Sequence, residues 1–98
     1  MTASVRVRAR AQRDLEEAAA WYETQRPGLG SEFLDEAQVA FGNVAKHPTA
    51  YPELYRATRR AVLRRFPFCV YYRISGDTVV VVAVLHGSRH PLRWMVRT

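Results

Sequence analysis

Arginines and two histidines are the residues of this sequence whose types and spacing suit binding or catalysis. Nine arginines and one acidic residue follow Tyr55, so the second part of the chain has a formal charge of +8. Guanidinium groups bind phosphate and carboxylate through paired hydrogen bonds and stay charged at neutral pH. His86 and His90 flank a Gly-Ser-Arg run, and imidazole exchanges protons near neutral pH. This half therefore suits a polyanion or an acidic protein partner.

These arginines are expected around an antiparallel sheet, where strand alternation assigns them to faces. If Ala61 and Leu63 face the protein interior, Arg60, Val62 and Arg64 face away from it. A phosphate or carboxylate site on an open face would then include Arg60, Arg64, Arg73 and Arg89. The full set of predicted partner- or anion-binding residues is Arg59, Arg60, Arg64, Arg73, Arg89, Arg93 and Trp94. A solvated basic face that only keeps the protein soluble is the alternative.

Several of these residues have a structural alternative. His86 would end a strand with its ring hydrogen-bonded to the backbone, and His90 would be a solvated loop residue. Trp94 either anchors a partner or folds back onto the sheet. Cys69 is the only cysteine, so neither an internal disulfide nor a thiolate metal site can form, and a buried apolar role is expected. The sequence predicts no metal and no cofactor.

Hydrophobic periodicity predicts the elements that position these residues. Period-two alternation indicates strands and a 3.6-residue period indicates helices. The predicted strands are 4–8, 56–64, 66–74 and 78–86, and the predicted helices are 11–25 and 31–46, the second capped by Ser31. Trp21 and Tyr22 of the first helix are expected in the core. The last strand is expected to be central because Val79 to Leu85 has no polar alternation.

The element order predicts an α+β fold, β-α-α-β-β-β, in one domain spanning residues 1–98. The two amphipathic helices form a hairpin whose apolar face packs on a small, twisted, mainly antiparallel sheet. The 98 residues leave no room for a second domain. Neither a charged leader nor an apolar run long enough to span a bilayer is present, so we expect a cytoplasmic protein that binds no membrane.

Three segments carry a resemblance to a known family: WYETQRPGLGSEFL at 21–34, RRAVLRRFPFCVYYRI at 59–74 and VVAVLHGSRHPLRW at 81–94. Together they resemble the RelE/ParE superfamily, the toxins of bacterial type II toxin–antitoxin systems. The resemblance implies a β-α-α-β-β-β toxin that inhibits growth and is neutralised by a cognate antitoxin, through which alone it would meet DNA. The PGLG turn and the HGSRHP run are more similar to the ParE branch, whose members poison DNA gyrase and are not known as nucleases.

The RelE branch implies a different activity, metal-independent cleavage of messenger RNA on the ribosome. By this resemblance Arg64 and Arg89 would bind phosphate, and His86 or His90 would transfer protons. The lysines of that branch are absent near the second predicted strand, and Trp94 is the aromatic residue nearest to its C-terminal tyrosine. An indole cannot exchange a proton in that role. A third alternative is a member that binds its antitoxin without being toxic.

Overall fold

The computed structural model describes residues 2–88 and 91–98. Its elements are β1 (Ser4–Val7), α1 (Ala9–Gln25), α2 (Leu29–Lys46), β2 (Glu53–Tyr55), β3 (Thr58–Val62), β4 (Phe68–Ser75), β5 (Thr78–His86) and α3 (Leu92–Met95). Two helices pack on a five-stranded mixed sheet, which confirms the predicted α+β class. None of the described helices is long and apolar enough to cross a membrane.

The strands form one sheet in the order β1-β5-β4-β3-β2. β1 runs parallel to β5, and all other neighbouring strands are antiparallel. β5 therefore lies between two strands, and every residue from Val79 to Leu85 is buried, which confirms that it is central. Gly76, with a φ of 61°, lies in the turn from β4 to β5, a backbone conformation that glycine adopts without steric cost.

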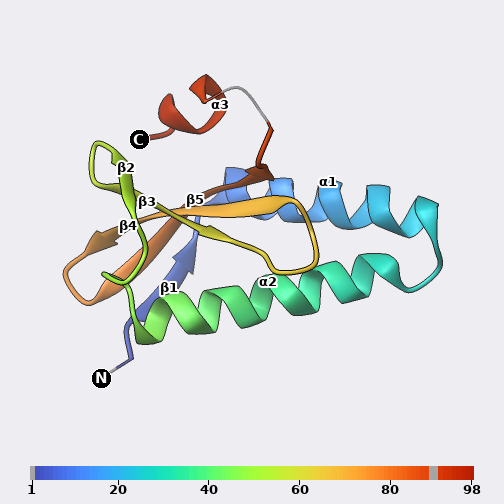
Figure 1. Ribbon diagram of the computed structural model, residues 1–98, viewed down its shortest axis with the longest axis horizontal. Coiled ribbons are helices and arrows are strands. Elements are labelled where there is room, and N and C mark those ends of the chain that lie inside the picture. Colours follow the sequence, from blue (N-terminus) through green and yellow to red (C-terminus); the bar gives the residue numbers. More distant parts are fainter. Residues whose placement is uncertain (1, 89–90) are drawn as a thin grey trace.

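α1 and α2 cover one face of the sheet, and α3 lies on the other face (Figure 1). The larger core joins both long helices to the sheet through side chains such as Leu15, Phe33 and Tyr72. The two helices approach closely at Gly30, where an added Cβ would lie 2.6 Å from the Ala19 carbonyl oxygen. Glycine therefore permits the close packing of the helical hairpin.

The smaller core lies between α3 and the second face of the sheet. Trp94 is only 6% exposed, and its ring stacks on Tyr71 with the centroids 4.7 Å apart. The other buried residues of this cluster are Cys69, Val80, Val82, Ala83 and Leu85. Burial of large aromatic rings stabilises such contacts, so the last residues of the chain form part of the fold. Sequence periodicity did not predict α3, which has only four residues.

Of the strand predicted over residues 56–64, only Thr58–Val62 forms a strand, β3, and residues 56 and 57 form the turn that joins it to β2, a short strand that was not predicted. Arg56 and Ala57 have φ values of 47° and 62°, and the chain reverses between Tyr55 and Thr58. Two successive residues with positive φ form the type I′ turn of tight hairpins. The prediction was wrong because such turns usually contain Asn or Gly, and this turn contains neither.

α2 begins at Leu29, two residues earlier than predicted, and Ser31 does not cap it. The N-cap residue is Gly28, with a φ of 88°. Glu23 of α1 accepts hydrogen bonds from the backbone N–H groups of Gly28, at 2.9 Å, and Gly30, at 3.0 Å. One carboxylate thus satisfies two N–H groups at the positive end of α2, where helices leave such groups unpaired.

Candidate partner-binding site

A groove of about 540 Å³ lies between α2 and β3. Val39 of α2 and Val62 of β3 line it, and they are 59% and 62% exposed. Ala40, Ala61 and Leu63 contribute further apolar surface to the same groove. Exposed apolar side chains that gather in a depression are typical of surfaces that bind another molecule.

Charged residues of both signs border this groove. Arg65 donates a hydrogen bond to Glu32 at 2.7 Å, and Arg26 donates to the other oxygen of that carboxylate at 3.1 Å. These hydrogen bonds, chiefly the one from Arg65 and next the one from Arg26, lower the pKa of Glu32 below its usual value. The backbone N–H of Arg65 also donates to Glu36 at 3.0 Å. Arg65 is thus tied to α2, whereas Arg64 makes no ion pair with any described residue.

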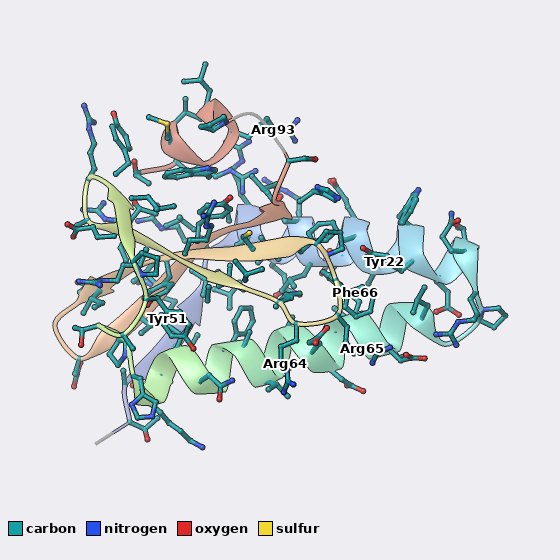
Figure 2. The ribbon with its side chains drawn as sticks, viewed as in Figure 1. Tyr22, Tyr51, Arg64, Arg65, Phe66 and Arg93 are labelled. Atoms are coloured by element: carbon teal, nitrogen blue, oxygen red, sulfur yellow. The ribbon has the colours of Figure 1, made fainter. Side chains whose placement is uncertain are left out.

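Arg64 lies on the groove that α2 and β3 form, and Figure 2 shows it with Arg65 beside α2. The predicted alternation holds within β3, because Ala61 and Leu63 are buried and Val62 is exposed. β3 ends at Val62, but the alternation continues to Arg64, which is exposed. Val62 and Arg64 both line the groove beside α2, a position that strand alternation alone did not predict.

The other predicted arginines that the structure describes do not form one exposed cluster with Arg64. Arg59 donates to the carbonyl oxygens of Tyr51, at 2.6 Å, and Thr49, at 3.3 Å, so it holds the segment before β2. Arg73 donates to the carbonyl oxygen of Thr98 at 3.4 Å. Both guanidinium groups have contacts within the chain, and their part in binding stays a prediction.

α3 covers much of the sheet face that was predicted to be open. Trp94 packs on that face rather than standing free, so the second alternative for its side chain is correct. Arg60 is half-buried on the same face. Burial raises the pKa of Tyr71, and the nearby Arg60 guanidinium opposes this shift. Arg93 is exposed on α3, across the sheet from the groove (Figure 2).

His86 lines a second cleft, of about 670 Å³, between α1, the end of β5 and α3. Its Nδ1 accepts the Ser88 backbone N–H at 3.1 Å and lies 2.7 Å from the Ser88 hydroxyl oxygen. The ring also packs edge-on against Phe68, with the centroids 5.5 Å apart. The ring is thus hydrogen-bonded to the backbone at the end of a strand, as the structural alternative describes, and a part for His86 in proton transfer stays a prediction. The predicted site residues Arg89 and His90 lie outside the described residues.

Predictions for three other side chains have different outcomes. Cys69 is buried, and burial raises the pKa of its thiol, as expected for an unreactive cysteine. Tyr22 packs against Phe66 at 4.8 Å and belongs to the periphery of the larger core. Trp21 is 58% exposed, so its predicted core position was wrong; it borders the second cleft instead. In the part of the chain that the structure describes, no cluster of side chains suits a metal ion.

Asp14 of α1 and Arg97, which lies after α3, form an ion pair that the sequence did not predict. Arg97 donates to Asp14 at 2.5 Å, and the side chains are 7% and 10% exposed. Asp14 also accepts the Val84 backbone N–H at 3.0 Å, and Arg97 donates to the Val82 carbonyl oxygen at 3.3 Å. The pair therefore occupies the edge of β5 beyond the end of β1. Its partners are 83 residues apart in the sequence, and no local pattern relates them.

Comparisons with known proteins agree with this architecture. The family model described as the ParE toxin of the type II toxin–antitoxin system, parDE, matches residues 5–91. Toxin ParE2 of Mycobacterium tuberculosis is 30% identical over 95 residues, covering 93% of this chain and 88% of that protein. Both the family match and this relative cover nearly the whole chain.

Two solved structures share the fold. The chromosomal ParDE system of P. aeruginosa contains a chain that matches with a TM-score of 0.77 and 16% identity, covering 87% of this chain and 96% of that one. The RelBE2 toxin–antitoxin complex of Mycobacterium tuberculosis matches with a TM-score of 0.62 and 26% identity, over 88% and 99%. With this fold, the family match and the relative from Mycobacterium tuberculosis identify the chain as a toxin of a type II toxin–antitoxin system. Within that class, the chain belongs to the ParE toxin family.

Proposed function

We propose that this toxin inhibits DNA gyrase when free and is neutralised by a cognate antitoxin that binds in the groove between α2 and β3. Membership of the ParE family supports the gyrase target, because the resemblance to the ParE branch implies it. The solved relatives come from toxin–antitoxin systems, which supports an antitoxin partner. The groove is the observation that carries the assignment of the binding site.

The composition of the groove fits a segment with apolar and acidic side chains. Val39 and Val62 offer exposed apolar surface, whose burial stabilises a complex by about 25 cal/mol per Å² before the costs of association. Arg64, which makes no ion pair with a described residue, can bind a carboxylate of the partner. The positive charge of this half of the chain would speed encounter with an acidic partner.

Two matched substitutions test the antitoxin site. Val39→Glu places a charge in the groove, and Val96→Glu places the same charge on a valine that is 72% exposed outside the groove lining. We expect cells that express the V39E toxin to be rescued poorly by the antitoxin encoded beside it. Cells that express the V96E toxin should be rescued like those with the native chain. Equal rescue of both variants would contradict this assignment.

Induced expression without the antitoxin tests the target. A gyrase poison should trigger the DNA damage response and filamentation while bulk protein synthesis continues at first. Immediate arrest of translation with cleaved messages would instead identify a ribosome-dependent endonuclease and contradict the gyrase proposal. Unaffected growth with well-folded protein would contradict both mechanisms and leave an antitoxin-binding protein without toxicity.

His86 separates the two mechanisms more directly. Its Nδ1 accepts a backbone N–H, so Nε2 is the nitrogen available for exchange with solvent or substrate. His86→Gln removes the imidazole ring and should leave gyrase poisoning largely intact. A loss of toxicity in the H86Q variant, with its fold retained by circular dichroism, would favour the endonuclease.

A further inference from the structure

Four exposed arginines lie where β1 ends and α1 begins. They are Arg6, Arg8, Arg10 and Arg13, and we call them the β1–α1 arginine surface. Residues 1–55 contain six basic and eight acidic residues, a formal charge of −2, so the total charge of this part of the chain conceals the cluster. The first acidic residue is Asp14, which follows all four arginines.

Arg6 and Arg8 lie on the side of the molecule that carries α3. Arg6 is in register with Val80, which belongs to the smaller core. Paired residues of adjacent strands point to the same face of a sheet, so Arg6 stands on the α3 face. Arg8 donates a hydrogen bond to the carbonyl oxygen of Arg97, two residues after α3, at 3.1 Å. This single bond leaves most N–H donors of the Arg8 guanidinium for an external acceptor.

Arg10 and Arg13 continue this surface along α1. Arg10 lies one helical turn before Asp14, and Arg13 is three positions from Arg10, so the two arginines are neighbours on the helix surface. Asp14 binds Arg97, and none of the four arginines forms an ion pair with a residue that the structure describes. Arg10 also lies in the first turn, where a cation opposes the helix dipole. This uncompensated charge does not stabilise the fold and is available to an external anion.

The β1–α1 arginine surface lacks the apolar side chains of a protein interface. Between residues 6 and 13, the exposed residues are the four arginines, Ala9 and Gln12, and no large apolar side chain is exposed there. The groove beside β3 differs, because it exposes Val39 and Val62. Binding to a nucleic acid backbone is driven by the release of counterions from phosphates and needs no apolar contact. The surface therefore fits phosphates better than it fits a protein.

We propose that the β1–α1 arginine surface binds the phosphate backbone of duplex DNA directly. This inference rests on the proposed function, because a toxin bound to gyrase would meet the DNA that gyrase holds. β5 and β4 separate β1 from β3 in the sheet, so an antitoxin in the groove would leave this surface accessible. The family resemblance implies contact with DNA only through the antitoxin, whereas this surface predicts a direct contact.

Two double variants with the same net charge test the position of the contact. Arg10→Gln with Arg13→Gln removes two charges from the β1–α1 arginine surface, and glutamine is compatible with a helix. Lys46→Gln with Arg56→Gln removes two exposed cations elsewhere, at the end of α2 and in the turn between β2 and β3. Neither Lys46 nor Arg56 forms an ion pair with a described residue. Circular dichroism and urea unfolding check that both variants keep the fold.

Fluorescence anisotropy with a labelled DNA duplex measures binding by the toxin alone over a series of salt concentrations. At about 0.1 M salt, R10Q/R13Q should weaken binding at least tenfold, and the slope of log K against log salt should fall by about 1.8, since each phosphate contact contributes about 0.9. K46Q/R56Q should change the affinity less than threefold. Equal losses in the two variants, or native affinity in R10Q/R13Q, would overturn the inference. Tighter binding of single-stranded RNA than of the duplex would also overturn the assignment to DNA.

A DNA cleavage assay with purified gyrase separates this inference from the proposed function. If the native toxin does not increase the amount of gyrase-cleaved DNA, the proposed function fails. If the native toxin is active, R10Q/R13Q should require at least fivefold more protein for the same cleavage, and K46Q/R56Q should act like the native chain. Equal activity of R10Q/R13Q and the native toxin would overturn the inference alone. R10Q/R13Q should also bind the antitoxin with native affinity; a tenfold loss there would assign the surface to the antitoxin and overturn the inference.

Discussion

The buried ion pair between Asp14 and Arg97 leads to a quantitative prediction of stability. Asp14→Ala leaves the Arg97 guanidinium without its carboxylate, and it also leaves the Val84 N–H without an acceptor. Loss of one partner of a buried ion pair costs about 3–5 kcal/mol. Because both side chains keep slight exposure and water can partly solvate the remaining charge, we expect the lower end, a loss of about 3 kcal/mol in the free energy of unfolding.

Urea unfolding of four proteins measures this loss and isolates its cause. They are the native chain, Asp14→Ala, Arg97→Met and the double variant. The double variant should be more stable than the sum of the two single losses predicts, because no buried charge is left unpaired. Asp14→Asn, which keeps an acceptor for the Val84 N–H, should lose less than Asp14→Ala. Additive losses, or a loss below about 1 kcal/mol in Asp14→Ala, would refute this account of the pair.

Three further predictions concern other parts of the fold. Glu23→Ala removes the acceptor of two N–H groups at the start of α2 and should cost about 1–2 kcal/mol in urea unfolding, with Glu23→Gln intermediate. Burial raises the pKa of Tyr72 to about 12; ionisation then favours the unfolded chain, so stability should fall between pH 10 and 12, and less in Tyr72→Phe. Acrylamide should quench the fluorescence of Trp21 strongly and that of Trp94 weakly, because only Trp21 is exposed. In the Trp21→Phe variant Trp94 is the only tryptophan, so its fluorescence should be quenched much less than that of the native chain.

The long helices and the central strand were predictable because their signals are local and repeated. β5 is buried on both faces and needs apolar residues at every position from Val79 to Leu85. Such a run distinguishes a central strand without knowledge of its neighbours. In the helices, Phe33 and Phe41 recur at helical spacing and both lie in the core.

The hairpin of β2 and β3 was not predictable from the same signals. Its turn places Arg56 and Ala57 at positive φ, and neither residue is typical of that conformation. The hydrogen bonds from Arg59 to the segment before β2 support this hairpin, and they depend on contacts formed only after folding. A local rule was therefore overridden by tertiary contacts.

The candidate site was predicted in its chemistry but only partly in its geometry. The arginine content predicted a surface that binds carboxylate or phosphate, and strand alternation correctly predicted that Val62 is exposed. The difference between Arg64 and Arg65 could not be predicted, because it depends on Glu32 and Glu36 of α2. Arg64 and Arg65 follow the end of β3 at Val62, in the turn toward β4. There the regular alternation of a strand ends, so two adjacent arginines have different partners.

The lengths of the two edge strands connect the fold to the proposed binding. β1 ends before β5 does, and β2 covers only the first part of β3, so each side of the sheet leaves an uncovered edge. On β5, Asp14 and Arg97 occupy that edge and also fix the end of the chain beside α1. On β3, the uncovered residue is Val62, beside an apolar groove and Arg64, which makes no ion pair with a described residue. A partner bound in that groove would therefore meet the sheet where β2 does not cover it, and would leave the cores on both faces intact.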